Sequence, residues 1–161
     1  TPSQGITPTQ TPTGTFDPTE TPVPSVTPPT LTPTPTASTP VPLGVTIAMP
    51  SHDFTEGDTC WLRITIHNPD LPLHEIPLFV ILSAAGNYWC APGWKSFPDQ
   101  GLDYYILDTV ETGNTPMDII SPFIWPGNTG SASGLAFYTA LTDPEITRIL
   151  GTYDVWEFAF R

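Results

Sequence analysis

The histidines are the first side chains to consider for catalysis in this sequence. His52, His67 and His74 lie in or beside expected loops, and no serine or cysteine nucleophile motif accompanies them. No glycine-rich phosphate loop is present, and no CxxC pair or Cys/His cluster has the spacing of zinc ligands. We therefore expect no catalytic residue, no cofactor and no zinc site in this chain.

Carboxylates form two local groups. Asp53, Glu56 and Asp58 share one polar turn, and Asp99 and Asp103 share another. Oxygen ligands suit calcium, but neither group has the DxDxDG spacing of a calcium loop. We interpret both groups as solvated turns, with no bound metal.

The two cysteines could form a covalent link. Cys60 begins a run of alternating apolar residues, and Cys90 follows the next apolar strand. In a secreted β-domain, such a pair predicts a disulfide. The alternative is two buried free thiols.

The threonines of residues 1–43 are the third chemical feature. This segment holds twelve prolines and fourteen threonines and begins at Thr1 inside the repeat, as in a processed or partial protein. Proline favours extended polyproline II, which exposes each hydroxyl and reaches about 130 Å over 43 residues. Threonine with proline is typical of O-glycosylated stalks, so we expect attached glycans; a flexible unmodified linker is the alternative. The candidate O-glycosylation sites are Thr7, Thr9, Thr11, Thr13, Thr19, Thr21, Thr27, Thr30, Thr32, Thr34, Thr36 and Thr39.

Large apolar residues occur at intervals along the same stem. Among them are Phe16, Val23, Val26 and Leu31, and a pure spacer has no need of Phe16. We expect them to anchor the stem as an arm on neighbouring subunits.

From residue 44 the pattern changes to short strands separated by turns. Apolar alternation or apolar runs at 45–49, 60–68, 77–82, 103–110, 133–141 and 153–160 predict strands, with a weaker one at 117–125. TDPE at 142–145 resembles a capping box and predicts one short helix that ends near Gly151. Residues 44–161 are therefore expected to form an all-β, Ig-like β-sandwich of about 7–9 strands; a jelly roll is the alternative topology.

A family resemblance supports this expectation. The order GDTCWLRITIHNPD…PLFVIL, from Gly57 to Leu82, resembles the start of extracellular Ig-like domains of the bacterial cell-surface adhesion type. The resemblance implies a domain of a stalk, filament or binding module that catalyses no reaction.

The aromatic residues allow two interpretations. They could form a flat platform for sugar rings, or they could fill the core, as large aromatics usually do. Trp61 differs, because its strand turns it away from Leu62 and Ile64, so it is either covered by packing on the second face or available to a neighbour or glycan. The remaining candidates are Trp89, Trp94, Tyr104, Tyr105, Trp125 and Trp156.

Charge and hydropathy exclude several partners. Residues 44–161 hold four basic side chains against fourteen acidic ones, which argues against nucleic acid and anionic membranes. The longest apolar stretch, Ile76 to Gly86, is shorter than the roughly 18 residues of a membrane span, so we expect no membrane insertion.

These features together predict a secreted, extracellular or cell-surface structural protein. The expected partners are copies of itself, which it would join through its arm as the repeating subunit of a glycosylated helical filament or surface fibre. In this respect the chain is similar to glycan-coated bacterial fibres. The alternative is a carbohydrate-binding module attached by a Thr/Pro linker to a secreted enzyme or cell-surface protein.

Overall fold

The computed structural model describes residues 41–128 and 130–161, and within them every regular element is a β-strand. This confirms the all-β class. The strands are β1 (Gly44–Ala48), β2 (Asp53–Phe54), β3 (Thr59–Asn68), β4 (Leu73–Ala84), β5 (Asn87–Cys90), β6 (Lys95–Phe97), β7 (Tyr105–Val110), β8 (Gly113–Ile124), β9 (Ala132–Thr142) and β10 (Ile149–Phe160).

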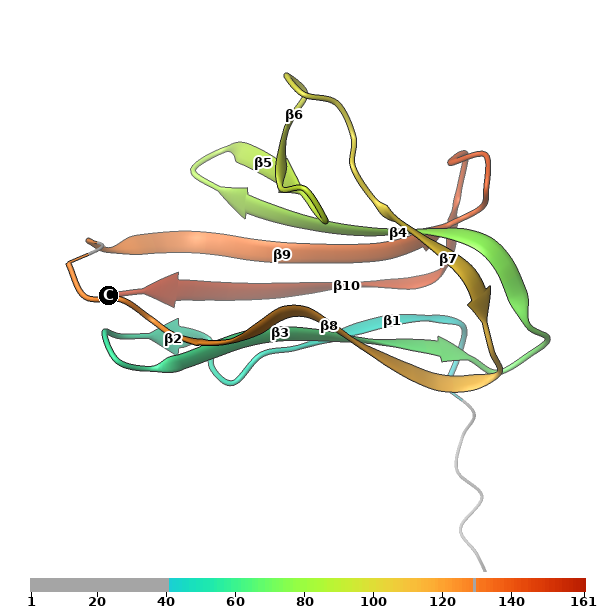
Figure 1. Cartoon of the computed structure of the whole chain (residues 1–161), viewed down its shortest axis with the longest axis horizontal. Helices are drawn as coiled ribbons and strands as arrows, with labels where there is room; N and C mark the ends of the chain where they lie inside the picture. The colour runs from blue at the N-terminus through green and yellow to red at the C-terminus, as the bar shows by residue number, and fades with distance from the viewer. Residues whose placement is uncertain (1–40, 129) are drawn as a thin grey trace, which may run out of the picture. The chain divides into compact units, whose positions relative to one another are not determined.

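The ten strands form a mixed sheet that curls into two layers, as expected for a β-sandwich. Its main order is β6-β5-β4-β9-β10-β1-β3-β8, with β7 added beside β4 and β2 beside β10. We call β1, β3 and β8 the small layer, and the other strands the large layer. In Figure 1 the ribbons of β4, β9 and β10 run above those of β1, β3 and β8. The buried side chains meet between these two layers.

The alternation in β3 builds the small layer. Cys60, Leu62, Ile64 and Ile66 are all buried, as their spacing predicts. Trp61 lies in the other phase and is half-buried. The guanidinium carbon of Arg63 lies 5.8 Å from the centre of the Trp61 ring, so this indole is partly covered by its own strand.

Strand β4 organises the large layer. Its Ile76, Leu78 and Val80 belong to the core, whereas Phe79 and Ile81 lie in the outward phase. One edge of β4 pairs with β9, and the other edge pairs with β7 and β5. Residues 77–82 therefore form a central strand, as their uninterrupted apolar sequence predicts.

The two layers join where β1 meets β10. Gly44 pairs with Thr152, and the Thr152 amide donates to the Leu43 carbonyl at 2.9 Å. Gly151 has a φ of +69°, and a Cβ there would overlap the Leu43 carbonyl oxygen. Glycine is thus required by both the backbone conformation and the close approach.

The short helix predicted from TDPE does not form. Residues 143–148 make a tight turn between β9 and β10, with Thr142 and Ile149 paired across its base. The Asp143 side chain accepts hydrogen bonds from the Thr147 amide at 2.7 Å and the Thr147 hydroxyl at 2.6 Å. The aspartate therefore caps a turn here, because the β9–β10 ladder fixes both of its ends.

The strand count also differs from the prediction of seven to nine. The hairpin of β5 and β6 and the two-residue β2 were not expected as separate strands. No helix within the described residues is long and apolar enough to cross a membrane.

Candidate binding surface

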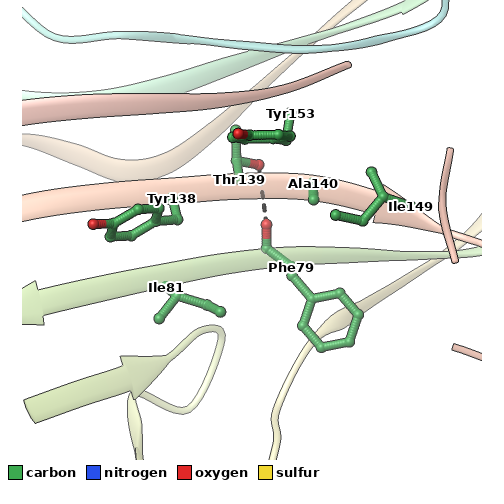
Figure 2. Close-up of a pocket in the computed structure, with 7 residues that line it drawn as sticks. All are labelled: Phe79, Ile81, Tyr138, Thr139, Ala140, Ile149 and Tyr153. Atoms are coloured by element: carbon green, nitrogen blue, oxygen red, sulfur yellow. Dashed lines mark hydrogen bonds between the residues drawn. The ribbon is translucent and has the colours of Figure 1, made fainter. Parts of the chain in front are cut away.

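A concave site lies on the outward face of the large layer. We call it the outer pocket; its volume is about 180 Å³. Figure 2 shows its side chains, which come from β4, β9 and β10. They are Phe79, Ile81, Tyr138, Thr139, Ala140, Ile149 and Tyr153.

Strand register explains this grouping. Ile81 lies opposite Tyr138, and Phe79 lies opposite Ala140, so these four residues share one face of the β4–β9 ladder. The small Ala140 leaves a hollow between larger side chains. Tyr153 is 63% exposed and Ile149 51% exposed, which leaves the hollow open to a partner.

The outer pocket is apolar and uncharged. Its one threonine hydroxyl, that of Thr139, is buried and donates to the Phe79 carbonyl at 3.0 Å. The phenol groups of Tyr138 and Tyr153 are the other side-chain polar groups among the lining residues. Such a site suits an apolar or aromatic-stacking ligand better than an ion or a strongly hydrated molecule.

A second hollow adjoins the first. We call it the hairpin pocket; its volume is about 190 Å³, and Ile81 lines both pockets. Tyr88 and Phe97 are a cross-strand pair of β5 and β6, and both are more than 40% exposed. The lining residues are Ile81, Tyr88, Cys90, Phe97 and Leu102. Together the two pockets extend an apolar surface from β10 to β6.

A third space lies on the inner side, between the layers. We call it the inner cavity; its volume is about 170 Å³. Small-layer and large-layer strands both contribute to its wall. It is lined by Met49, Cys60, Leu82, Ile120, Phe123, Trp125, Leu135, Phe137 and Phe158.

The predicted disulfide between Cys60 and Cys90 is not formed, and both cysteines are buried free thiols. Cys60 lines the inner cavity. Cys90 lies opposite Ile81 and lines the hairpin pocket, on the outward side of the large layer. The sheet itself separates the two sulfur atoms, which explains why they do not pair. Burial raises the pKa of the Cys60 thiol to about 11.

Most of the tryptophan and tyrosine residues considered for a sugar platform pack inward instead. Trp94, Tyr105, Trp125 and Trp156 contact the core. Burial is the main cause that raises the pKa of Tyr105 above its ordinary value. Trp89 is half-buried on β5.

The most exposed aromatic side chains among the described residues are Tyr88, Phe97, Tyr138 and Tyr153, which the sequence does not single out. The ring centre of the candidate Tyr104 lies 5.0 Å from that of Phe79. The alternating pattern of residues 135–141 places Tyr138 and Phe137 on opposite faces of the strand. It does not indicate which of these two faces is covered by the other layer.

The histidines are separate from one another and have local partners. His52 stacks on Trp156 with ring centres 4.1 Å apart. Nδ1 of His67 lies 2.8 Å from Oδ1 of Asn114, and Nδ1 of His74 lies 3.2 Å from the Thr109 hydroxyl. Nε2 of His67 also lies 3.0 Å from the Thr46 hydroxyl, so each histidine has partners of its own.

The carboxylates of the two turns likewise have local partners. Asp53 pairs with Arg161 at 3.0 Å, and Asp103 pairs with Lys95 at 3.5 Å. Asp58 accepts hydrogen bonds from the amide and hydroxyl of Thr55. Among the described residues, no three His, Cys, Asp or Glu side chains are grouped to hold a metal ion.

The candidate glycosylated threonines and the apolar arm residues Phe16, Val23, Val26 and Leu31 lie outside the described residues. The sequence matches no protein-family model and no curated protein.

Proposed function

We propose that this chain is a secreted structural protein that polymerises by seating its Thr/Pro arm on the outward face of a neighbouring copy. The observation that carries this proposal is the uncharged outer pocket with two exposed tyrosines. Proline-rich segments dock in aromatic-lined grooves, because a preformed extended chain loses little freedom on binding. The arm of this chain has that composition.

The distribution of charge also favours docking of the arm on the outward face of another copy. The described domain is strongly acidic, so two domains repel each other when they approach directly. Residues 21–41 of the arm contain no charged side chain. This segment can therefore approach the uncharged pockets of another copy without electrostatic repulsion.

The spacing of the pockets fits one part of the arm. The outer pocket is centred on β9 and the hairpin pocket on β5, which are two strands apart in the sheet. Two strand spacings amount to about 10 Å. In polyproline II, which has three residues per turn, Val23 and Val26 would share one face and lie about 9 Å apart. Val23 and Val26 are thus the proposed anchors for the two pockets.

The remaining features of the proposal follow from this contact. An arm that binds the next copy makes a head-to-tail contact, which builds an open helical filament. Threonine-linked glycans would occupy the solvent side of the docked arm and sheathe the fibre. The folded domain would be an adhesion-type Ig-like body at the cell surface or outside the cell, without catalytic activity.

Removal of the arm tests the polymer directly. Electron microscopy and sedimentation velocity of the native material should show fibres, and a chain lacking residues 1–42 should sediment as a monomer. Substitution of Val23 and Val26 by Ser should shorten the fibres, as should Tyr153→Ser. Leu71→Ser is the matched control, because Leu71 is an 80% exposed apolar residue outside both pockets. Fibres of unchanged length in the valine and tyrosine variants would overturn this assembly mode.

A carbohydrate-binding module is the second candidate. Its supporting observation is the row of exposed Tyr88, Tyr138 and Tyr153 on one sheet face, since tyrosine rings can stack on sugars. In that case the domain without residues 1–42 stays monomeric and is retained by an insoluble polysaccharide. Loss of retention in Tyr153→Ser, with unchanged assembly of the full chain, would select this function over polymerisation.

A further inference from the structure

The two tyrosines of the outer pocket carry hydroxyl groups that the fold itself does not use. Tyr138 is 40% exposed and Tyr153 is 63% exposed. Neither phenol hydroxyl has a hydrogen-bond partner among the described residues. The Thr139 hydroxyl, in contrast, is buried and donates to the Phe79 carbonyl. The two phenols are therefore the side-chain groups of this site that can form a new hydrogen bond with a ligand.

These hydroxyls lie at the rim of the outer pocket rather than inside it. The wall of the pocket is apolar, and Figure 2 shows both phenol oxygens directed to the same side, away from Ile149. A small molecule held inside the hollow would not reach them. A chain that runs across the sheet face would pass over the two rings and bring its backbone to the rim. The position of the hydroxyls thus favours an extended chain as the ligand.

A polyproline II chain has the complementary hydrogen-bonding groups. Its carbonyls have no partner within the chain, and each proline lacks an N–H, so its backbone offers mainly acceptors. A phenol hydroxyl can donate to such a carbonyl. The ring that carries the hydroxyl can at the same time pack against proline, as in the aromatic-lined grooves that take proline-rich segments. Tyr138 and Tyr153 therefore match both the apolar and the polar parts of this kind of chain.

We propose that the outward face of the large layer binds polyproline II segments as a class, with Tyr138 and Tyr153 donating hydrogen bonds to carbonyl oxygens of the bound chain. The required features are free carbonyls and a proline ring or apolar side chain at every third position. Proline-rich segments of other proteins would then bind as well as the arm does. This inference rests on the proposed function for the place of the site, and it extends the ligand from the arm to a class of chain.

A host with a free site tests the inference on the full chain. Val23→Ser combined with Val26→Ser removes the anchors of the chain's own arm, so that an added peptide meets no competitor. Three fluorescent peptides of equal length are titrated and followed by anisotropy. They are residues 21–31 of the arm (TPVPSVTPPTL), an oligoproline, and the arm peptide with its four prolines replaced by glycine. The first two should bind. The third should bind at least about tenfold more weakly, because it loses more conformational freedom on binding.

Removal of single hydroxyls in this host identifies the donors. Tyr138→Phe and Tyr153→Phe keep both rings. Each should weaken the binding of the arm peptide and of oligoproline about fivefold, the effect of one lost hydrogen bond. Tyr104→Phe is the matched control, because the Tyr104 ring lies 5.0 Å from that of Phe79 but Tyr104 lines neither pocket. It should leave both affinities unchanged.

The outcomes distinguish this inference from the proposed polymer. The inference is overturned, and arm docking stands, if the arm peptide binds but oligoproline does not. The same holds if the arm peptide binds and the loss of either tyrosine hydroxyl has no effect, or if the glycine peptide binds as tightly. Binding of oligoproline without binding of the arm peptide would instead overturn arm docking and retain the polyproline class. If neither peptide binds, both proposals are wrong.

Discussion

Cys60 and Cys90 lie on opposite sides of the large layer, although both are buried. Cys60 projects from β3 into the space between the layers, while Cys90 lies opposite Ile81 on the outward side. Two adjacent residues of β4 mark the two sides of this layer. Leu82 lines the inner cavity, whereas Ile81 lines both outward pockets. The two thiols cannot meet unless the sheet between them opens.

Two free thiols should therefore be found in the protein even when it is isolated under oxidising conditions. In denaturant without reductant, iodoacetamide should modify both cysteines, as measured by mass spectrometry. In the native state neither should react at neutral pH, because both are buried and the pKa of Cys60 is about 11. A fully pre-reduced sample provides the reference for complete labelling. Modification that requires prior reduction would contradict the structure.

The junction between the layers should be intolerant of a side chain at position 151. Gly151→Ala places a methyl group on the Leu43 carbonyl and should lower the free energy of unfolding by about 3 kcal/mol or more. Gly134→Ala is the control, because Gly134 has a similar φ of +66° but open space around it. Its cost should be about 1–2 kcal/mol, the penalty of the left-handed conformation alone. Equal losses in urea unfolding would remove steric overlap as the cause.

Sequence patterns predict the strands of this fold best where one face is buried. In β3 the alternation from Cys60 to Ile66 identifies the buried side chains directly, and in β10 Trp156, Phe158 and Phe160 all contact the core. The turn at 143–148 could not be assigned in the same way. Aspartate followed by proline begins either a helix or a turn, and only the long-range pairing of Thr142 with Ile149 decides between them.

The sequence predicts the candidate binding surface less well than it predicts the strands. In β9 the outward Tyr138 and inward Phe137 are both aromatic, so composition does not distinguish the exposed side from the covered one. The side of the sheet on which Cys90 lies depends on the register of β4 with β5. The hairpin between these two strands sets that register. The long-range pairing of β4 with β9 therefore determines the outer pocket, and the local β4–β5 hairpin determines the side of the sheet on which Cys90 lies.

Asn68 should be essential for stability at the end of β3. It is almost fully buried, and its amide donates to the carbonyls of Leu71 at 3.1 Å and Val110 at 3.0 Å. Asn68→Ala leaves these carbonyls without their donor and should cost about 2–3 kcal/mol of unfolding free energy. Asn68→Asp should cost more, because it places a carboxylate against carbonyl oxygens.

Asn87→Ala is the matched control for Asn68. Asn87 is exposed, and its one side-chain hydrogen bond, to Ala85, is 3.4 Å long. Its replacement should change the free energy of unfolding by less than about 0.5 kcal/mol. Chemical denaturation monitored by tryptophan fluorescence compares the three variants. A loss for Asn68→Ala no larger than that for Asn87→Ala would show that the buried amide contributes nothing to stability.

We expect the free energy of unfolding to fall at acidic pH because of Asp143. Hydrogen bonds from Thr147, together with the Arg148 amide and guanidinium, hold the pKa of Asp143 below its ordinary value of 3.8. Because the folded pKa is lower than the unfolded one, this stabilisation is complete above the unfolded value. It is lost as the pH falls through the folded value. Asp118, whose pKa is lowered by its hydrogen bond from Arg63, acts in the same direction.

Urea unfolding between about pH 5 and pH 2 measures this contribution. Asp143→Asn should be less stable than the native chain at pH 5, and the difference should shrink toward pH 2. Some acid dependence should remain in the variant because Asp118 is unchanged. Glu145→Gln, at an exposed position in the same turn, should keep the native profile. If Asp143→Asn differs from the native chain by a constant amount across this range, the charge of Asp143 contributes nothing and only the shape of the turn matters.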